Sequence, residues 1–147
     1  MGDFENALEY FSKALAIAQQ NQPQSHQGIA AVLGNIAGVY DSMGDYGKAL
    51  EYYTKALTSR QQYLPENHPD VAKSLCDIGW IYKEMGNCEK ALEYFLKGKE
   101  IFIACLGNEH HYTRQCIKTI KSRSSKTKPE PFKRYFPQMD NKFHLFY

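Results

Sequence analysis

Two cysteines and two histidines stand near one another late in the chain, and these residue types can bind a metal or act as nucleophiles. They are Cys105, His110, His111 and Cys116. Their spacing fits no zinc site well, because the ligands of structural zinc sites usually come in closer pairs. A Cys/His nucleophile pair needs a third group to orient the histidine, and nothing beyond residue type indicates one. The sequence therefore predicts no metal, no cofactor and no catalytic residue.

Composition and the remaining motifs narrow the class of protein further. The chain of 147 residues has room for about one domain, and its formal net charge is only +2. It contains neither a Gly-rich phosphate loop nor a His-Glu-x-x-His motif. No apolar run reaches the ~18–20 residues that a membrane helix needs. Four widely spaced cysteines are typical of a reduced, intracellular protein, so we expect a cytoplasmic location without a membrane partner.

An internal repeat with a constant step of 42 residues organises the chain. The recurring blocks are Met-Gly-Asp at 1–3, 43–45 and, with Asn, 85–87; Ala-Leu-Glu-Tyr at 7–10, 49–52 and 91–94; and His26, His68 and His110. Between residues 1–26 and 43–68, 14 of 26 positions are identical. His110 is therefore explained as a repeat residue rather than as a metal ligand.

Each repeat has the periodicity of two amphipathic helices. In the leading helix, apolar residues fall at i, i+3, i+4 and i+7. They are Leu33, Ile36, Ala37 and Tyr40, then Leu75, Ile78, Gly79 and Tyr82. In the second helix, small residues alternate with large ones, as in Ala7, Phe11 and Ala14. Gly44 and Gly86 are predicted to end the leading helices, and the following Asp45 and Asn87 to cap the second helices.

These patterns predict an all-α fold with a separate tail. The predicted helices span residues 4–20, 28–43, 46–62, 69–85, 88–104 and 110–122. They make residues 1–120 an array with a half repeat at 1–27, full repeats at 28–68 and 69–109, and a degenerate capping helix at 110–122. Pro69 is expected at the first position of its helix, where its missing N–H costs nothing.

The repeat resembles the tetratricopeptide repeat (TPR), in which an apolar residue is followed by Leu-Gly-x-x-Tyr, Ala, an aromatic residue and a second Ala. The matching residues of the first full repeat are Leu33, Ile36, Ala37, Tyr40, Gly44, Tyr46, Ala49, Tyr53 and Ala56. The longer period and the Asn-His-Pro-Asp link at 67–70 are similar to the kinesin light chain variety. The resemblance implies a right-handed superhelical solenoid of antiparallel helix pairs. It also implies a non-catalytic scaffold that binds a peptide or helix in its concave groove, as cargo adaptors do.

In such a family the leading helices line the groove, and the repeat position of each residue suggests which side chains contact a ligand. The resemblance implies a groove formed by Asn35, Gly38, Asp41, Lys73, Asp77, Trp80 and Lys83. Trp80 either anchors a partner in the groove or packs against the neighbouring leading helix. Asn35 and Asp77 either contact the ligand or are solvated polar residues. The recurrent Glu/Lys pairs at i, i+4, such as Glu9 and Lys13, are expected to form a solvated face.

Departures from the family pattern concern the first and last repeats. The first repeat begins at the methionine that closes the leading helix elsewhere, which leaves two alternatives: an interaction module, or a regulatory or targeting fragment of a larger multidomain enzyme. Gly98 and Lys99 stand where Ala and Leu are expected. Without a leading helix, the first helix is expected to expose apolar residues and to favour self-association. Those apolar residues are Phe4, Leu8, Phe11 and Leu15.

Residues 121–147 have a different composition, with seven of the 18 basic residues and two of the 16 acidic residues of the chain. They are predicted to be disordered or extended. Six aromatic residues follow the basic stretch: Phe132, Tyr135, Phe136, Phe143, Phe146 and Tyr147. This tail is interpreted as an untethered terminus, as a segment that docks on exposed apolar surface, or as a strip for single-stranded nucleic acid. The near-neutral charge of the whole chain disfavours nucleic acid.

Overall fold

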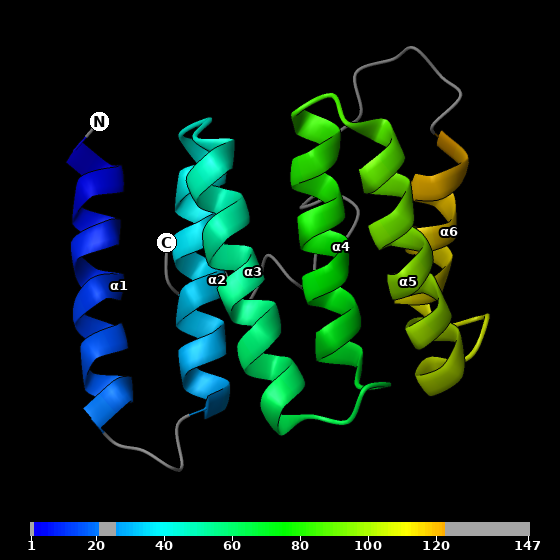
Figure 1. The fold of residues 1–147 in the computed structure, drawn as a ribbon, viewed down its shortest axis with the longest axis horizontal. Helices are drawn as coiled ribbons and strands as arrows, with labels where there is room; N and C mark the ends of the chain where they lie inside the picture. The colour runs from blue at the N-terminus through cyan, green and yellow to red at the C-terminus, as the bar shows by residue number, and fades with distance from the viewer. Residues whose placement is uncertain (1, 21–25, 123–147) are drawn as a thin grey trace. The chain divides into compact units, whose positions relative to one another are not determined.

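The computed structural model describes residues 2–20 and 26–122, and these residues form six α-helices and no strand (Figure 1). The helices are α1 (Gly2–Gln20), α2 (His26–Ser42), α3 (Tyr46–Tyr63), α4 (Pro69–Glu84), α5 (Cys88–Leu106) and α6 (His111–Lys121). Each predicted helix is present, and each predicted boundary lies within two residues of the observed one. The all-α class is confirmed, whereas all but two residues of the predicted 121–147 tail lie outside the described residues.

Glycines and short polar side chains form the turns between paired helices. Gly44 and Gly86 have φ values of 78° and 82°, which only glycine adopts without strain. Asp45 accepts a hydrogen bond from the Lys48 amide at 3.2 Å, and Asn87 accepts the equivalent bond from Lys90 at 3.1 Å. The predicted stop and cap signals are therefore confirmed in both full repeats.

The recurrent histidine has a structural role that the sequence did not suggest. Nδ1 of His68 accepts a hydrogen bond from the Asp70 amide at 3.0 Å and caps α4, whose first residue is Pro69 as predicted. Nδ1 of His110 accepts from the Tyr112 amide at 3.3 Å and caps α6 in the same way. An imidazole nitrogen thus satisfies an amide at the start of each helix that would otherwise lack a partner.

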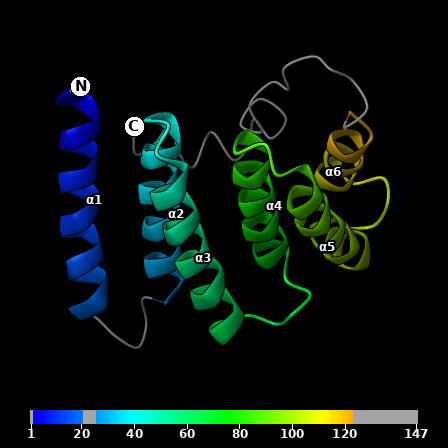
Figure 2. The same ribbon diagram turned by 45° about the horizontal axis from the view of Figure 1, so that its top comes forward.

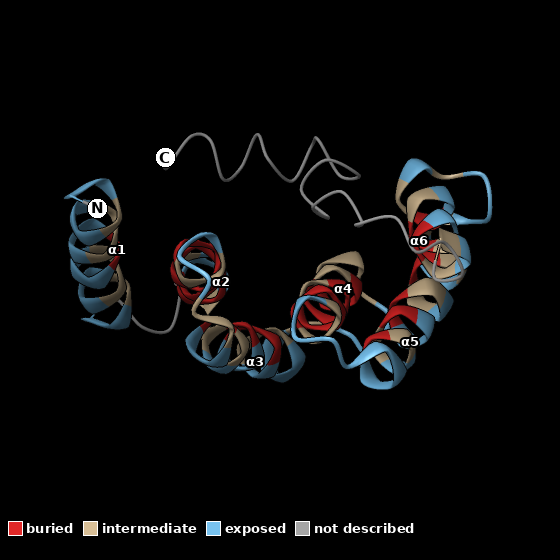
Figure 3. Cartoon of the chain, turned by 90° about the horizontal axis from the view of Figure 1, so that it is seen from above, coloured by how far each residue is buried: buried red, intermediate tan, exposed pale blue. Residues whose placement is uncertain are grey.

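The helices belong to two compact units, Met1–Pro65 and Glu66–Tyr147. Within the first unit, α2 contacts both α1 and α3; within the second, α5 contacts both α4 and α6 (Figure 2). In the first unit, one core cluster is formed by Phe11, Ile36 and Val39. Burial is concentrated on α2, where residues 33–39 are all buried, whereas most of α1 is exposed (Figure 3).

One sequence expectation about α1 is wrong. Phe11 is only 1% exposed, and the three other apolar residues expected to be uncovered are partly buried against the same cluster. They are Phe4, Leu8 and Leu15. Their side chains face α2, the leading helix of the next repeat. The large apolar residues that α1 exposes are Tyr10 and Ile17, which lie on a different flank.

In the second unit, a glycine lets two backbones approach closely. A Cβ atom on Gly79 of α4 would lie 3.2 Å from the Ala91 carbonyl oxygen and 3.2 Å from Cβ of Tyr94, both on α5. Beside this contact the rings of Tyr82 and Tyr94 stack with centroids 5.5 Å apart. The close approach explains why the second repeat carries glycine where the first carries Ala37.

Candidate functional site on the leading helices

The residues predicted to contact a ligand fall into two sets, one on the leading helix of each unit. On α2, Asn35, Gly38 and Asp41 recur every three residues and so share one helix face. Asn35 is 6% exposed, Gly38 is buried and Asp41 is half-buried. The Ser42 hydroxyl donates a hydrogen bond to the Gly38 carbonyl at 2.9 Å. On α2, therefore, Asp41 is the most accessible member of the predicted set.

On α4, Trp80 and Lys83 form a pair. The indole is 6% exposed, and Nζ of Lys83 lies 5.6 Å from the indole centroid, within the range of a cation–π interaction. Burial lowers the pKa of Lys83 below its ordinary value, although the neighbouring Cys88 and Glu84 oppose this. The charged end of Lys83 is thus partly removed from water and held against an aromatic ring.

Lys73, also predicted for this face, is engaged within its own unit. Its Nζ atom lies 3.5 Å from Oδ1 of Asp70 and 4.8 Å from the centroid of the Tyr112 ring on α6. Only 16% of its side chain is exposed. Asp77, one helical turn further along α4, is half-buried. Of the predicted residues on α4, Asp77 and Lys83 therefore keep the most accessible charge.

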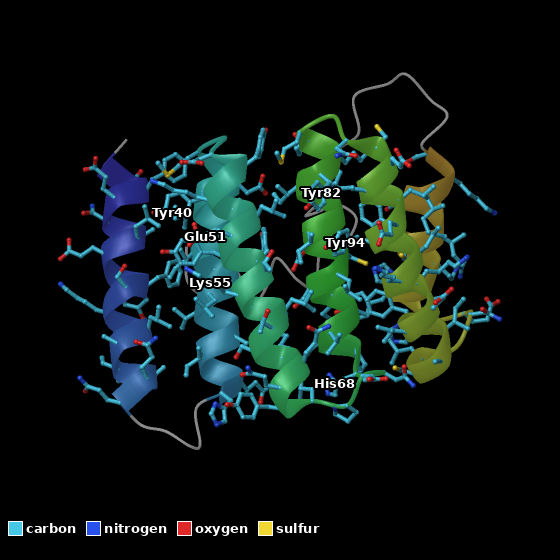
Figure 4. All side chains as sticks on the ribbon, viewed as in Figure 1. Tyr40, Glu51, Lys55, His68, Tyr82 and Tyr94 are labelled. Carbon is cyan, nitrogen blue, oxygen red and sulfur yellow. The ribbon has the colours of Figure 1, made fainter. Side chains whose placement is uncertain are left out.

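The other flank of the helix pairs carries a repeated tyrosine and lysine arrangement that the sequence did not suggest as a unit. The Tyr40 and Tyr52 rings stack at 5.6 Å, as Tyr82 and Tyr94 do (Figure 4). Nζ of Lys55 lies 4.8 Å from the Tyr52 centroid and 2.6 Å from Oε1 of Glu51. The spacing of tyrosine and lysine three residues apart in every second helix is the signal that could have revealed this arrangement.

The predicted solvated Glu/Lys face is confirmed in all three repeats. Glu9 and Lys13 are joined at 2.7 Å, and their side chains are 65% and 72% exposed. The pairs Glu51–Lys55 and Glu93–Lys97 repeat this geometry at 2.6 and 2.7 Å. The hydrogen bond from Lys97 is the main cause that lowers the pKa of Glu93. Pairs this exposed are screened by water and add little to stability.

Three of the four residues that could have done chemistry make separate contacts in the structure. Cys116 is buried, with its Sγ atom 3.3 Å from the Phe95 carbonyl oxygen, and Cys105 Sγ contacts the Asn67 carbonyl oxygen. His110 caps α6. Within residues 2–20 and 26–122, no group of three or more His, Cys, Asp or Glu side chains is placed to hold a metal ion.

Cys116 lies beside another buried cysteine of the second unit, Cys76. Sγ of Cys76 is 4.0 Å from Sγ of Cys116, and both side chains are fully buried. The hydrogen bond with Cys116 and burial raise the pKa of Cys76 well above its ordinary value. A thiol that stays protonated is a poor nucleophile.

An open hollow of about 650 Å³ lies beside α6, and none of the predicted ligand contacts lines it. Its lining is Asn108, Glu109, His111, Arg114, Gln115, Ile117, Lys118 and Lys121. Arg114, Lys118 and Lys121 stand where α4 has Ala72, Cys76 and Gly79, the small residues that let α5 approach. Basic side chains thus replace the small residues at these repeat positions of α6.

Comparison with known proteins supports the same fold. The family described as tetratricopeptide repeat matches residues 1–62 and, in an overlapping match, residues 28–104. Among solved structures, the crystal structure of BtubC (BKLC) from P. vanneervenii has a TM-score of 0.69 and 18% sequence identity, covering 99% of this chain and 70% of that chain. At this identity the similarity concerns the fold alone. No curated protein matches the sequence.

A membrane span is not found among the helices that the structure describes, since none combines sufficient length with sufficient apolar character. Tetratricopeptide repeats in general are non-catalytic modules for protein–protein interaction.

Proposed function

This chain belongs to the tetratricopeptide repeat family, and we propose that it binds a peptide or helix of another protein through the partly exposed charges of α4, with α2 presenting an equivalent face in the other unit. It acts in this proposal as a non-catalytic cytoplasmic scaffold of the kinesin light chain type. The observation that carries the proposal is the arrangement on α4, where Asp77, Trp80 and Lys83 share one helix face. The 42-residue period and the histidine caps of the link support the kinesin light chain subtype.

Buried and partly exposed side chains have different roles on each of the two helices. Trp80 on α4 and Asn35 on α2, each 6% exposed, fix the shape of their own helix face, because rigid side chains lose little entropy when a ligand binds. Asp77 and Lys83 on α4, and Asp41 on α2, are half-buried and present the charged atoms. Because both signs are present, the ligand in this proposal carries both basic and acidic groups. Charge complementarity then selects the partner more than it adds affinity.

The test is to select peptides that bind the full chain and to measure their affinity for charge-reversed variants. Asp77→Lys should weaken peptides that bind α4, and Asp41→Lys should weaken peptides that bind α2, by at least about tenfold, which corresponds to 1.4 kcal/mol. Trp80 is the single tryptophan, so its fluorescence reports binding next to Lys83 directly. Glu93→Lys, on the exposed face of α5, is the matched control and should leave the affinity unchanged.

Circular dichroism of each variant shows whether the helices are intact. If the selected peptides bound Asp41→Lys and Asp77→Lys as well as they bind the unmodified chain, with no change in tryptophan emission, neither α2 nor α4 would be the binding surface.

A further inference from the structure

The exposed face of α6 is basic. This helix contains no acidic residue, and its three basic residues and first histidine recur at steps of three and four. With about 100° between successive residues of a helix, these four side chains lie within an arc of about 80°. The arc is centred opposite the buried face formed by Thr113, Cys116 and Thr119. All four side chains are exposed: His111, Arg114, Lys118 and Lys121.

The same four side chains line the hollow of about 650 Å³ beside α6, and Glu109 is the one acidic residue of that lining. Arg114 and Lys118 make no ion pair with any residue in the part of the chain that the structure describes. By contrast, the exposed lysines of the Glu/Lys pairs on α1, α3 and α5 each have a carboxylate oxygen within 2.7 Å. The hollow therefore has an excess of positive charge that the described residues do not neutralise.

Basic residues are outnumbered in the rest of the second unit. Residues 66–110 carry five basic and eight acidic residues. An anion that extends far beyond the hollow would therefore meet repulsion from this part of the unit, so a short acidic ligand fits the charge pattern best. Residues 123–147 of the chain itself are a poor occupant, because they carry six basic and two acidic residues.

The spacing of the basic side chains fits an extended peptide. The row from His111 to Lys121 is about 15 Å long, and the rise from Arg114 to Lys118 is about 6 Å. In an extended chain, side chains on one face lie about 7 Å apart, so about five residues span the row. We infer that this hollow binds an extended acidic segment of another protein, with Asp or Glu at alternate positions. The site is separate from the ligand surface proposed on α4.

NMR titration of the ¹⁵N-labelled full chain with the peptide acetyl-Glu-Thr-Glu-Thr-Glu-amide tests the inference. The amides of α6 should show saturable shifts with a Kd below about 1 mM. Raising the salt from about 0.05 to about 0.5 M should weaken binding at least about tenfold, since the contacts are exposed charge pairs. Arg114→Glu and Lys118→Glu should each weaken binding by a similar factor. Glu109→Gln should tighten it, because it removes the acid of the lining.

Two variants and one peptide serve as controls. Lys97→Glu makes the same charge change on α5, where the lysine side chain is 54% exposed, and should leave the affinity unchanged. Asp77→Lys should also leave it unchanged, which separates this site from the one proposed on α4. The peptide with Gln in place of Glu should not bind.

Three results would overturn the inference. The first is the absence of saturable shifts in α6 at millimolar peptide. The second is binding that survives the combined Arg114→Glu and Lys118→Glu variant, because the peptide would then occupy another basic segment, such as residues 123–147. The third is tighter binding of oligothymidylate than of the peptide at α6, which would indicate a nucleic-acid site. The ¹⁵N spectrum of each variant shows whether its fold is intact.

Discussion

Gly98 stands at a repeat position where the other two second helices carry Ala14 and Ala56. The reason lies across the helix pair. A Cβ atom at Gly98 would be 2.6 Å from Sγ of Cys76, whereas α2 has Gly34 at the position of Cys76. Each full repeat therefore combines one residue without a side chain and one small residue, in opposite order. Glycine at position 98 thus leaves room for the Cys76 side chain, which accounts for this departure from the family pattern.

This exchange predicts the effect of single substitutions. Gly98→Ala should lower the free energy of unfolding by about 1–2 kcal/mol, because overpacking outweighs the gain in helix propensity. Adding Cys76→Ala should recover most of that loss, since the sulfur atom is the obstacle. Gly34→Ala, with no heavy atom within 4 Å of the added Cβ, should instead gain about 0.5–1 kcal/mol. Urea denaturation followed by circular dichroism measures all three, and a neutral Gly98→Ala would contradict the explanation.

Lysines of this chain differ in pKa for two physical reasons. Burial lowers the pKa of Lys83, whereas the hydrogen bond with Glu93 raises the pKa of Lys97. NMR titration of reductively methylated protein should give a lower pKa for Lys83 than for Lys97. In about 1 M salt, where screening acts within ~3 Å, the pKa of Lys97 should move back towards its ordinary value while that of Lys83 stays low. Equal salt responses would show that charge pairing, not burial, determines both.

How much of the candidate site the sequence could predict depends on the range of the interaction. The 42-residue step placed Asn35 and Asp77 on equivalent faces, because helical periodicity is local. It could not show that Lys73 contacts Tyr112, since the two residues belong to different helices and Tyr112 has no counterpart at its repeat position in the other units. Nor could it decide the burial of Trp80, which depends on packing rather than on spacing.

At the scale of the helices, boundaries were predictable because the signals that create them are local. Gly44 and Gly86 adopt left-handed conformations, and Asp45 and Asn87 follow as caps. The histidine caps were missed because histidine is not among the usual capping residues. Its recurrence was visible in the sequence, but only the structure shows Nδ1 accepting a backbone N–H.

The N-terminal cap of α5 can be tested by replacing Asn87 with the residue that caps α3. Asn87→Ala should destabilise the chain by about 1 kcal/mol, because the Lys90 amide loses its acceptor at the start of the helix. Asn87→Asp should be nearly neutral, since Asp45 fills the same role for α3. Thermal denaturation of the two variants distinguishes them. If Asn87→Asp destabilised the chain as much as Asn87→Ala, the hydrogen bond from the Lys90 amide would not be what stabilises the start of α5.

At the scale of the whole molecule, tetratricopeptide arrays gain stability from contacts between neighbouring helices, so a helix with one open flank should open first. α1 buries only Phe11 completely and exposes Tyr10 and Ile17, whereas α4 buries nine residues. In dilute solution the backbone amides of α1 should therefore exchange with solvent at least about tenfold faster than those of α4.

The same measurement has a matched reference in α5. Exchange in α5 should be slower than in α1, since Tyr94 of α5 is covered by Tyr82 whereas the equivalent Tyr10 of α1 is 58% exposed. Protection of α1 equal to that of α4 in dilute solution would contradict the predicted order of opening.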